Sequence, residues 1–178
     1  MKKVILINSV LTFLLCILTH FLYEWFPNPV FAIFFPVNES IWEHMKMLYT
    51  TILLYGIIEY YILGKFNENR NNFLISLFAK SIIAIPIYLA IYLPFRYFFG
   101  EIMIASFIIL FSTILLVNYL GTKIMNFDTI KYQKYISVVG IITMYIIMAI
   151  LTFNAPRTDL FFDTEEEKYG INDYLIKK

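Results

Sequence analysis

Five long apolar stretches are the feature that most limits what this chain can fold into. They cover residues 4–26, 42–64, 73–99, 102–121 and 135–153 of the 178-residue sequence. Each could cross a hydrocarbon layer of about 30 Å as a helix, which takes roughly 20 residues. Because 60% of the residues are hydrophobic and 15% are charged, a small soluble domain could not cover the apolar side chains. The sequence therefore predicts an all-α, polytopic transmembrane helical bundle of about five spans.

The composition also excludes several other classes of protein. A formal net charge of +1 gives no basic surface for a nucleic acid. The single cysteine, Cys16, excludes a disulfide scaffold, and the hydrophobicity is too high for a disordered chain. The expected partner is the lipid bilayer, with a lipid or small molecule as candidate ligand and no nucleic acid.

The basic residues of the connections predict the orientation in the membrane. Lysines and arginines collect before the first span and between alternate spans, at Lys2, Lys3, Lys65, Arg70, Lys123, Lys131 and Lys134. Because basic loops stay in the cytoplasm, we expect the N-terminus inside and the C-terminus outside. The expected organisation is a membrane domain of residues 1–153 and an extracytoplasmic tail of residues 154–178, in a multi-pass protein of the cell membrane.

Polar residues gather at the expected outer surface in three groups. His20 and Glu24 lie four residues apart in the first span, so a continuous helix puts them on one face. A second group occupies residues 38–44 at the start of the second span, and a third follows the fifth span at residues 154–163. Because ionisable groups are costly within a membrane, they are read first as functional.

This convergence supports a candidate catalytic or metal site. The candidate catalytic residues are His20, Glu24, His44, Asp159 and Asp163. Two imidazoles with carboxylates suit zinc or a similar divalent metal, and the candidate metal ligands are His20, Glu24 and His44, with one tail carboxylate. The alternative without metal uses a histidine as general base, its pKa tuned by a neighbouring carboxylate.

A further set of residues around these could bind a ligand. The candidates are Asn38, Glu39, Ser40, Trp42, Glu43 and Arg157. Some also have a structural interpretation. Ser40 and Glu43 match a capping box at a helix start, and Trp42 fits the aromatic belt of a membrane interface. Deeper in the bundle, a pair between Glu59 and Lys80 would neutralise both charges, as a structural tie first and an ion path second. The alternative is that Lys80 snorkels to the inner surface.

Two sequence blocks carry a family resemblance. The first joins the region of His20 to the run PVNESIWEHMK at residues 36–46, and the second comprises FNAP, LFFD and YGI at residues 153–156, 160–163 and 169–171. Together they resemble a family of small, mainly Gram-positive bacterial integral membrane proteins classed as a domain of unknown function. The abundance of Ile, Asn, Lys, Phe and Tyr is also typical of a bacterial genome rich in A and T. The resemblance implies membership but no activity.

Three hypotheses on function stay open at this point. The first is an extracytoplasmic membrane enzyme, a hydrolase or transferase that acts on a lipid or lipid-linked substrate through metal or acid–base chemistry. The second is a component that binds or transports a small ligand in an outward pocket. The third is a structural or regulatory membrane subunit, in which the polar motif caps helices and holds the tail.

Overall fold

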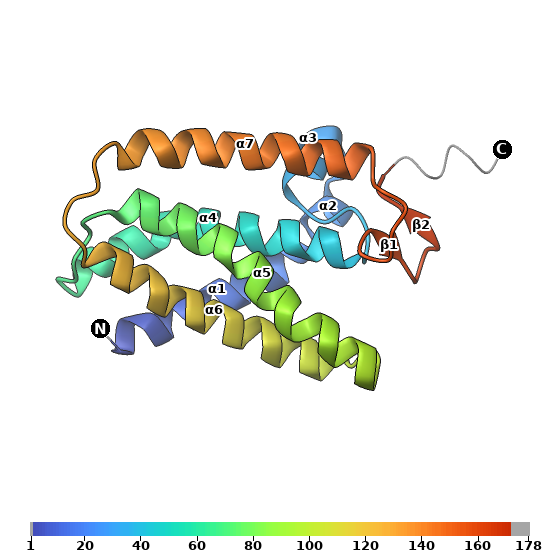
Figure 1. Cartoon of the computed structure of the whole chain (residues 1–178), viewed down its shortest axis with the longest axis horizontal. Helices are drawn as coiled ribbons and strands as arrows, with labels where there is room; N and C mark the ends of the chain where they lie inside the picture. Colours follow the sequence, from blue (N-terminus) through green and yellow to red (C-terminus); the bar gives the residue numbers. More distant parts are fainter. Residues whose placement is uncertain (1, 172–178) are drawn as a thin grey trace.

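The computed structural model describes residues 2–171 as a bundle of long helices (Figure 1). Residues 172–178 of the expected tail lie outside the described part. The elements are α1 (Lys2–His20), α2 (Leu22–Trp25), α3 (Pro29–Phe34), α4 (Ile41–Lys65), α5 (Phe73–Phe99), α6 (Met103–Met125), α7 (Gln133–Phe153), β1 (Phe162–Asp163) and β2 (Lys168–Tyr169).

The expected membrane architecture is confirmed. Within the described residues, five helices are long and apolar enough to cross a membrane: α1 together with α2, and α4, α5, α6 and α7. They fall on the five apolar stretches of the sequence. The largest difference is at the end of α6, which continues to Met125 rather than stopping near Gly121. The chain is thus an all-α, multi-pass membrane protein.

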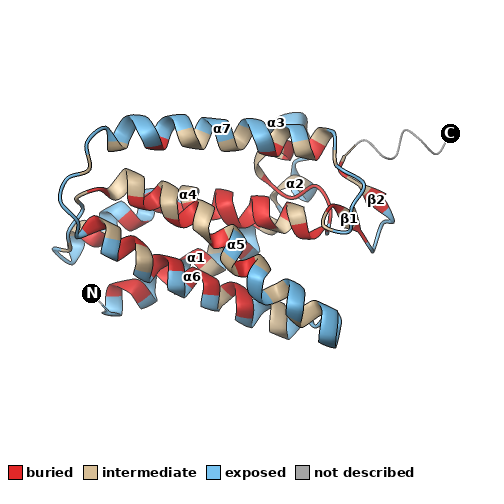
Figure 2. Cartoon of the chain, in the orientation of Figure 1, coloured by how far each residue is buried: buried red, intermediate tan, exposed pale blue. Residues whose placement is uncertain are grey.

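The interior is formed mainly by α1, α4, α5 and α6. Helix α5 packs on α6 and α4, and α1 packs on α4 and α6, whereas α7 lies against α5 and α3. A cluster of buried apolar side chains, including Leu48, Ile52 and Ile114, fills the middle. Figure 2 shows α7 mostly exposed and the buried faces concentrated on α4 and its neighbours. Exposed apolar helix faces suit a lipid environment.

One end of the bundle, here called the basic end, holds the start of α1 and the α4–α5 and α6–α7 connections (Figure 1). An asparagine-rich turn fastens the two connections together. The amide of the buried Asn72 donates to the carbonyls of Ile124, Phe127 and Asp128, and its oxygen accepts from the Ile130 amide at 2.8 Å. This residue has φ 55°, a left-handed conformation that asparagine tolerates better than most residues.

The opposite end, here called the tail end, holds α2, α3, the start of α4 and residues 154–171 (Figure 1). Strands β1 and β2 pair antiparallel, with Phe162 opposite Tyr169. At Gly170, φ is +56°, and a Cβ atom would lie 2.5 Å from the Thr152 carbonyl oxygen. Only glycine fits this approach, which allows the tail to fold back onto the end of α7.

A buried ion pair ties three helices together at this end. Lys46 lies 2.5 Å from Glu43 and donates to the Ala32 carbonyl of α3 at 2.7 Å and to Thr152 of α7 at 2.8 Å. Glu43 also accepts from Thr152 and from the Val37 amide. Because both charged groups are surrounded by polar partners, the pair satisfies its hydrogen bonds within the bundle.

Candidate functional site

Three side chains from separate segments converge at the tail end. His20 is the last residue of α1, His44 lies in the first turns of α4, and Glu39 belongs to the loop just before α4. The His20 and His44 Nε2 atoms are 3.2 Å apart, and each lies 3.4 Å from Glu39 Oε2. These three atoms form a nearly regular triangle.

Local sequence orients His44 within this group. Ser40 caps α4 by accepting from the Glu43 amide, and its own carbonyl accepts from His44 Nδ1 at 2.9 Å. Because a carbonyl oxygen can only accept, the Nδ1 atom carries the proton. The Nε2 atom of neutral His44 therefore keeps its lone pair, directed at His20 and Glu39, which is how metal-binding histidines are commonly held.

The tail positions the loop that carries Glu39. The buried Asp163 accepts from the Glu39 amide at 3.1 Å through Oδ2, and from the Glu165 and Glu166 amides through Oδ1. The amide of Asn38 donates to the Gly170 carbonyl at 3.2 Å, while its oxygen accepts from the Ser40 amide. Residues of the second sequence block, Asp163 and Gly170, thus hold the loop of the first block in place by hydrogen bonds.

The triangle has the dimensions of a metal-binding site. A tetrahedral ion with bonds of about 2.0–2.1 Å holds its ligand atoms roughly 3.3–3.4 Å apart. The two imidazole nitrogens and the carboxylate oxygen each lie within 4.8 Å of the others, as ligands of one ion would. Atoms this close together are held either by imidazole N–H groups that donate within the group or by a metal ion between their lone pairs.

Glu39 is well suited to be the charged member of the group. Its side chain is 40% exposed, so it remains within reach of water. The hydrogen bond with His20 lowers the pKa of the Glu39 carboxyl. Burial opposes this effect, and the electrostatic influence of the two histidines adds to it. The carboxylate is therefore ionised near neutral pH and available to a cation.

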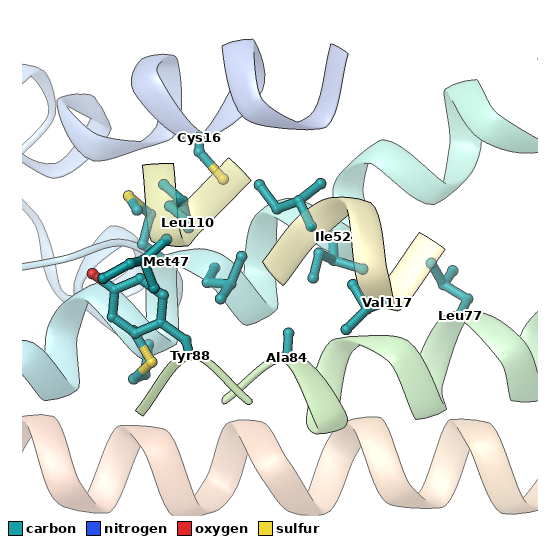
Figure 3. Packing of buried hydrophobic residues seen from close by; sticks show 12 residues of the cluster. Cys16, Met47, Ile52, Leu77, Ala84, Tyr88, Leu110 and Val117 are labelled. Atoms are coloured by element: carbon teal, nitrogen blue, oxygen red, sulfur yellow. The ribbon is translucent and has the colours of Figure 1, made fainter. Parts of the chain in front are cut away.

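A pocket of about 510 Å³ opens from this group into the bundle. His20, Glu39 and His44 line one part of it together with Glu165 of the tail. Apolar residues of the central cluster line another part, and Figure 3 shows Cys16, Met47, Tyr88 and Leu110 gathered there. The cavity thus joins a polar group to an apolar chamber formed by membrane-spanning helices, which is the shape an amphiphilic molecule requires.

Several residues expected at the site lie elsewhere. Glu24 is exposed on α2, after α1 has ended at His20, so the two residues do not share one uninterrupted helix face. Asp159 and Arg157 are exposed in the tail, and neither is among the described residues that line the pocket. The structure brings His20 and His44 to Glu39, not to Glu24.

Other expected site residues hold the fold together. The Trp42 amide donates to the Leu160 carbonyl at 2.9 Å, and its ring lies 5.1 Å from that of Phe161. Asp163 does not reach the histidines; it holds the backbone of Glu39. Glu43 belongs to the ion pair with Lys46, and the expected capping box is only half formed, because the Glu43 carboxylate accepts from Val37 rather than from Ser40.

Sequence reasoning missed two charged residues of the pocket, Arg96 and Glu101. Arg96 is in the last turn of α5 and Glu101 in the connection to α6, and the two form an ion pair. The sequence feature that could have identified them is a pair of opposite charges beside a short connection that has no other charged residue.

A second polar group lies deeper in the bundle, and the expected Glu59–Lys80 pair within it is confirmed. Lys80 also donates to Asn118, which in turn donates to Ser9 at 3.1 Å. Glu59 is about 22 Å from His44 along α4, since the rise is about 1.5 Å per residue. Buried apolar residues of the central cluster, including Leu48 and Ile52, lie between the two polar groups.

Comparison with known proteins places the chain in one family. No curated protein and no solved structure matches it. Residues 1–171, which include both sequence blocks and all three residues of the triangle, match the family of unknown function DUF6512. The chain, which has five helices long and apolar enough to cross a membrane, belongs to the family DUF6512, whose function is unknown.

Proposed function

We propose that this protein is a metal-dependent hydrolase or transferase that acts on a lipid or lipid-linked substrate at the outer face of the cell membrane. The observation that carries the proposal is the triangle of His20 Nε2, His44 Nε2 and Glu39 Oε2, with sides of 3.2, 3.4 and 3.4 Å. These are the spacings of three ligands around one small divalent ion.

The donor set favours zinc and a catalytic role. Two imidazoles and one carboxylate make a set found in zinc hydrolases, where three protein ligands leave a position for water or substrate. All three side chains line the pocket. A divalent ion held there would supply a Lewis acid and lower the pKa of a water molecule bound to it.

The chain's own residues then have distinct tasks. His20, His44 and Glu39 bind the ion, and Ser40 and Asp163 orient two of these ligands through backbone contacts. Glu165 lines the same pocket, so its carboxylate is the candidate to accept a proton from the attacking nucleophile and return it to the leaving group. The apolar chamber would hold the hydrocarbon part of the substrate.

The test begins with metal content. The full-length protein is purified in dodecyl maltoside, loaded with zinc, dialysed and analysed by elemental mass spectrometry. We expect about one zinc ion per chain, lost in His20→Ala, His44→Ala and Glu39→Gln. Glu24→Gln is the matched control and should keep its zinc, because Glu24 is exposed on α2.

Activity is then sought by incubating the same samples with a membrane lipid extract and following products by mass spectrometry. A zinc-dependent product that disappears with chelator and returns with zinc would support the proposal. A product that needs the histidines but no metal would favour acid–base chemistry instead. If the protein binds no metal, and the variants of His20, His44 and Glu39 lose stability but no activity, the proposal is overturned in favour of a structural role.

The transport alternative has less support. A transport path would need polar groups from one side of the bundle to the other, whereas the central apolar cluster lies between His44 and the Glu59–Lys80 pair. Lys80 and Glu59 are both nearly completely buried and paired with each other. This arrangement suits a structural tie between α4 and α5.

A further inference from the structure

A second pair of charges stands on the wall of the same pocket. Arg96 lies in the last turn of α5 and Glu101 precedes α6, and Arg96 Nη2 is paired with Glu101 Oε1. The Arg96 side chain is 25% exposed and that of Glu101 is 53% exposed. The guanidinium is therefore the more enclosed partner, and the carboxylate faces water.

Arg96 is the only lysine or arginine among the described residues that line the pocket. Its neighbours on that wall include Tyr92, Ile102 and Met103, so the positive charge borders an apolar chamber. The ion pair with Glu101 is formed between Arg96 Nη2 and Glu101 Oε1, and a guanidinium carries five N–H donors in a planar fork. Such a fork matches the paired oxygens of a phosphate group as well as those of a carboxylate, so a phosphate can take the place of the half-exposed Glu101 carboxylate.

The charges of the pocket indicate how negative that ligand can be. Its lining includes the carboxylates of Glu39, Glu101 and Glu165 and the guanidinium of Arg96. If Glu101 turns out into water and a divalent ion joins the histidines, Glu39 and Glu165 oppose Arg96 and the ion. One positive charge then remains, which one singly charged phosphodiester neutralises.

We propose that Arg96 binds the phosphate of a phospholipid whose acyl chains occupy the apolar chamber, and that Glu101 competes with this phosphate for the guanidinium. The inference rests on the proposed function and names its substrate class, an anionic phospholipid rather than a neutral lipid. Glu101 holds Arg96 at the pocket wall until the lipid arrives. An ion pair that is half in water is weak enough to be displaced.

Binding is measured by isothermal titration calorimetry on the full-length, zinc-loaded protein in dodecyl maltoside, and mass spectrometry of the recovered probe reports any turnover. The probe is dihexanoyl phosphatidylglycerol, and dihexanoylglycerol and inorganic phosphate serve as its uncharged and free-anion counterparts. We expect Arg96→Gln to weaken phosphatidylglycerol binding by about tenfold or more, the usual loss for a charge-assisted contact. Arg96→Lys should lose less, because the charge remains.

Glu101→Gln gives the decisive contrast. It removes the competitor, so it should tighten phosphatidylglycerol binding several-fold, in the direction opposite to Arg96→Gln. If the pair is only structural, both substitutions weaken binding alike, and the proposal is overturned. Equal binding of dihexanoylglycerol would exclude recognition of the phosphate, and equal binding of inorganic phosphate would exclude a lipid ligand.

Two controls keep the result interpretable. The thermal unfolding temperature of each variant reports folding, and if Arg96→Gln does not fold, Arg96→Lys and Glu101→Gln still decide between the outcomes. Zinc content is measured on separate portions of the same preparations. If the wild-type protein binds no zinc, the proposed enzyme is overturned. If Arg96→Gln binds phosphatidylglycerol as tightly as the wild type does, the proposed role of Arg96 is overturned.

Discussion

His20 and His44 stand 24 positions apart in the sequence, on different helices, and direct their Nε2 atoms at one another across 3.2 Å. Two neutral imidazoles meet in this way when one Nε2 atom carries a proton and donates it to the other, or when a cation lies between their lone pairs. Because Glu39 completes the triangle, the three side chains are spaced as ligands of one divalent ion would be.

The first prediction concerns Asp163, which holds the Glu39 backbone. Asp163→Asn replaces one acceptor oxygen by a donor, so either the Glu39 amide or the turn at Glu165 loses its partner. We expect zinc affinity to fall by about tenfold or more, as for other groups that orient ligands. Competition with a chromophoric chelator measures it. Asp159→Asn, at an exposed tail position, should keep wild-type affinity, and equal affinity in both variants would refute the bracing role.

The second prediction concerns the buried pair of Glu43 and Lys46. Lys46→Met leaves the Glu43 carboxylate buried without its counter-ion, which should lower the free energy of unfolding by about 3–5 kcal/mol. Combining it with Glu43→Gln removes the charge and should restore part of the loss. Thermal unfolding in detergent measures both, with Lys65→Met at the exposed end of α4 as control. Equal unfolding temperatures for single and double variants would contradict this view.

The third prediction concerns Gly170, where the tail meets α7. Gly170→Ala puts a Cβ atom about 2.5 Å from the Thr152 carbonyl oxygen in a left-handed conformation, at a cost of roughly 1–3 kcal/mol for the backbone strain alone. We expect the tail to detach, so that trypsin cleaves after Lys168, which is buried in the native hairpin. Gly100→Ala strains the α5–α6 connection instead and should leave the bond after Lys168 resistant. Unchanged resistance in Gly170→Ala would count against tail packing.

The fourth prediction concerns orientation in the membrane. In a Cys16→Ala background, a membrane-impermeant maleimide should label Asp159→Cys in intact cells but label Lys131→Cys only after permeabilisation. The physical reason is that the basic residues, which stay in the cytoplasm, collect at the end opposite the triangle. Both positions are exposed, so access alone decides the result. The reverse pattern would put the site in the cytosol.

Features that depend on the hydropathy or the charge of one segment could be predicted from the sequence. Hydropathy over some 20 residues identifies a span whatever its neighbours are, and the five helices follow the five apolar stretches. The Glu59–Lys80 pair was predictable for a related reason. Within an apolar bundle a lone charge is costly, which favoured a pair between these two charges on neighbouring spans, and the structure contains that pair.

The choice of carboxylate at the site was not predictable in this way. Helical spacing favoured Glu24 beside His20, but α1 ends at His20 and the chain turns before α2 begins. Glu39, one of several polar residues in its loop, reaches the histidines because Asp163 holds its backbone from 124 positions away. Spacing along one segment carries no information about such a contact.

The sequence by itself determined that the chain crosses a membrane, where its helices lie, and that both histidines belong to one end of the bundle. The tertiary structure alone decided that Glu39 joins them, that Glu43 is taken by Lys46, and that Arg96 and Glu101 share their pocket. The physical reason is that burial from water acts on each segment separately. A site of three atoms depends instead on how distant segments are fixed against one another.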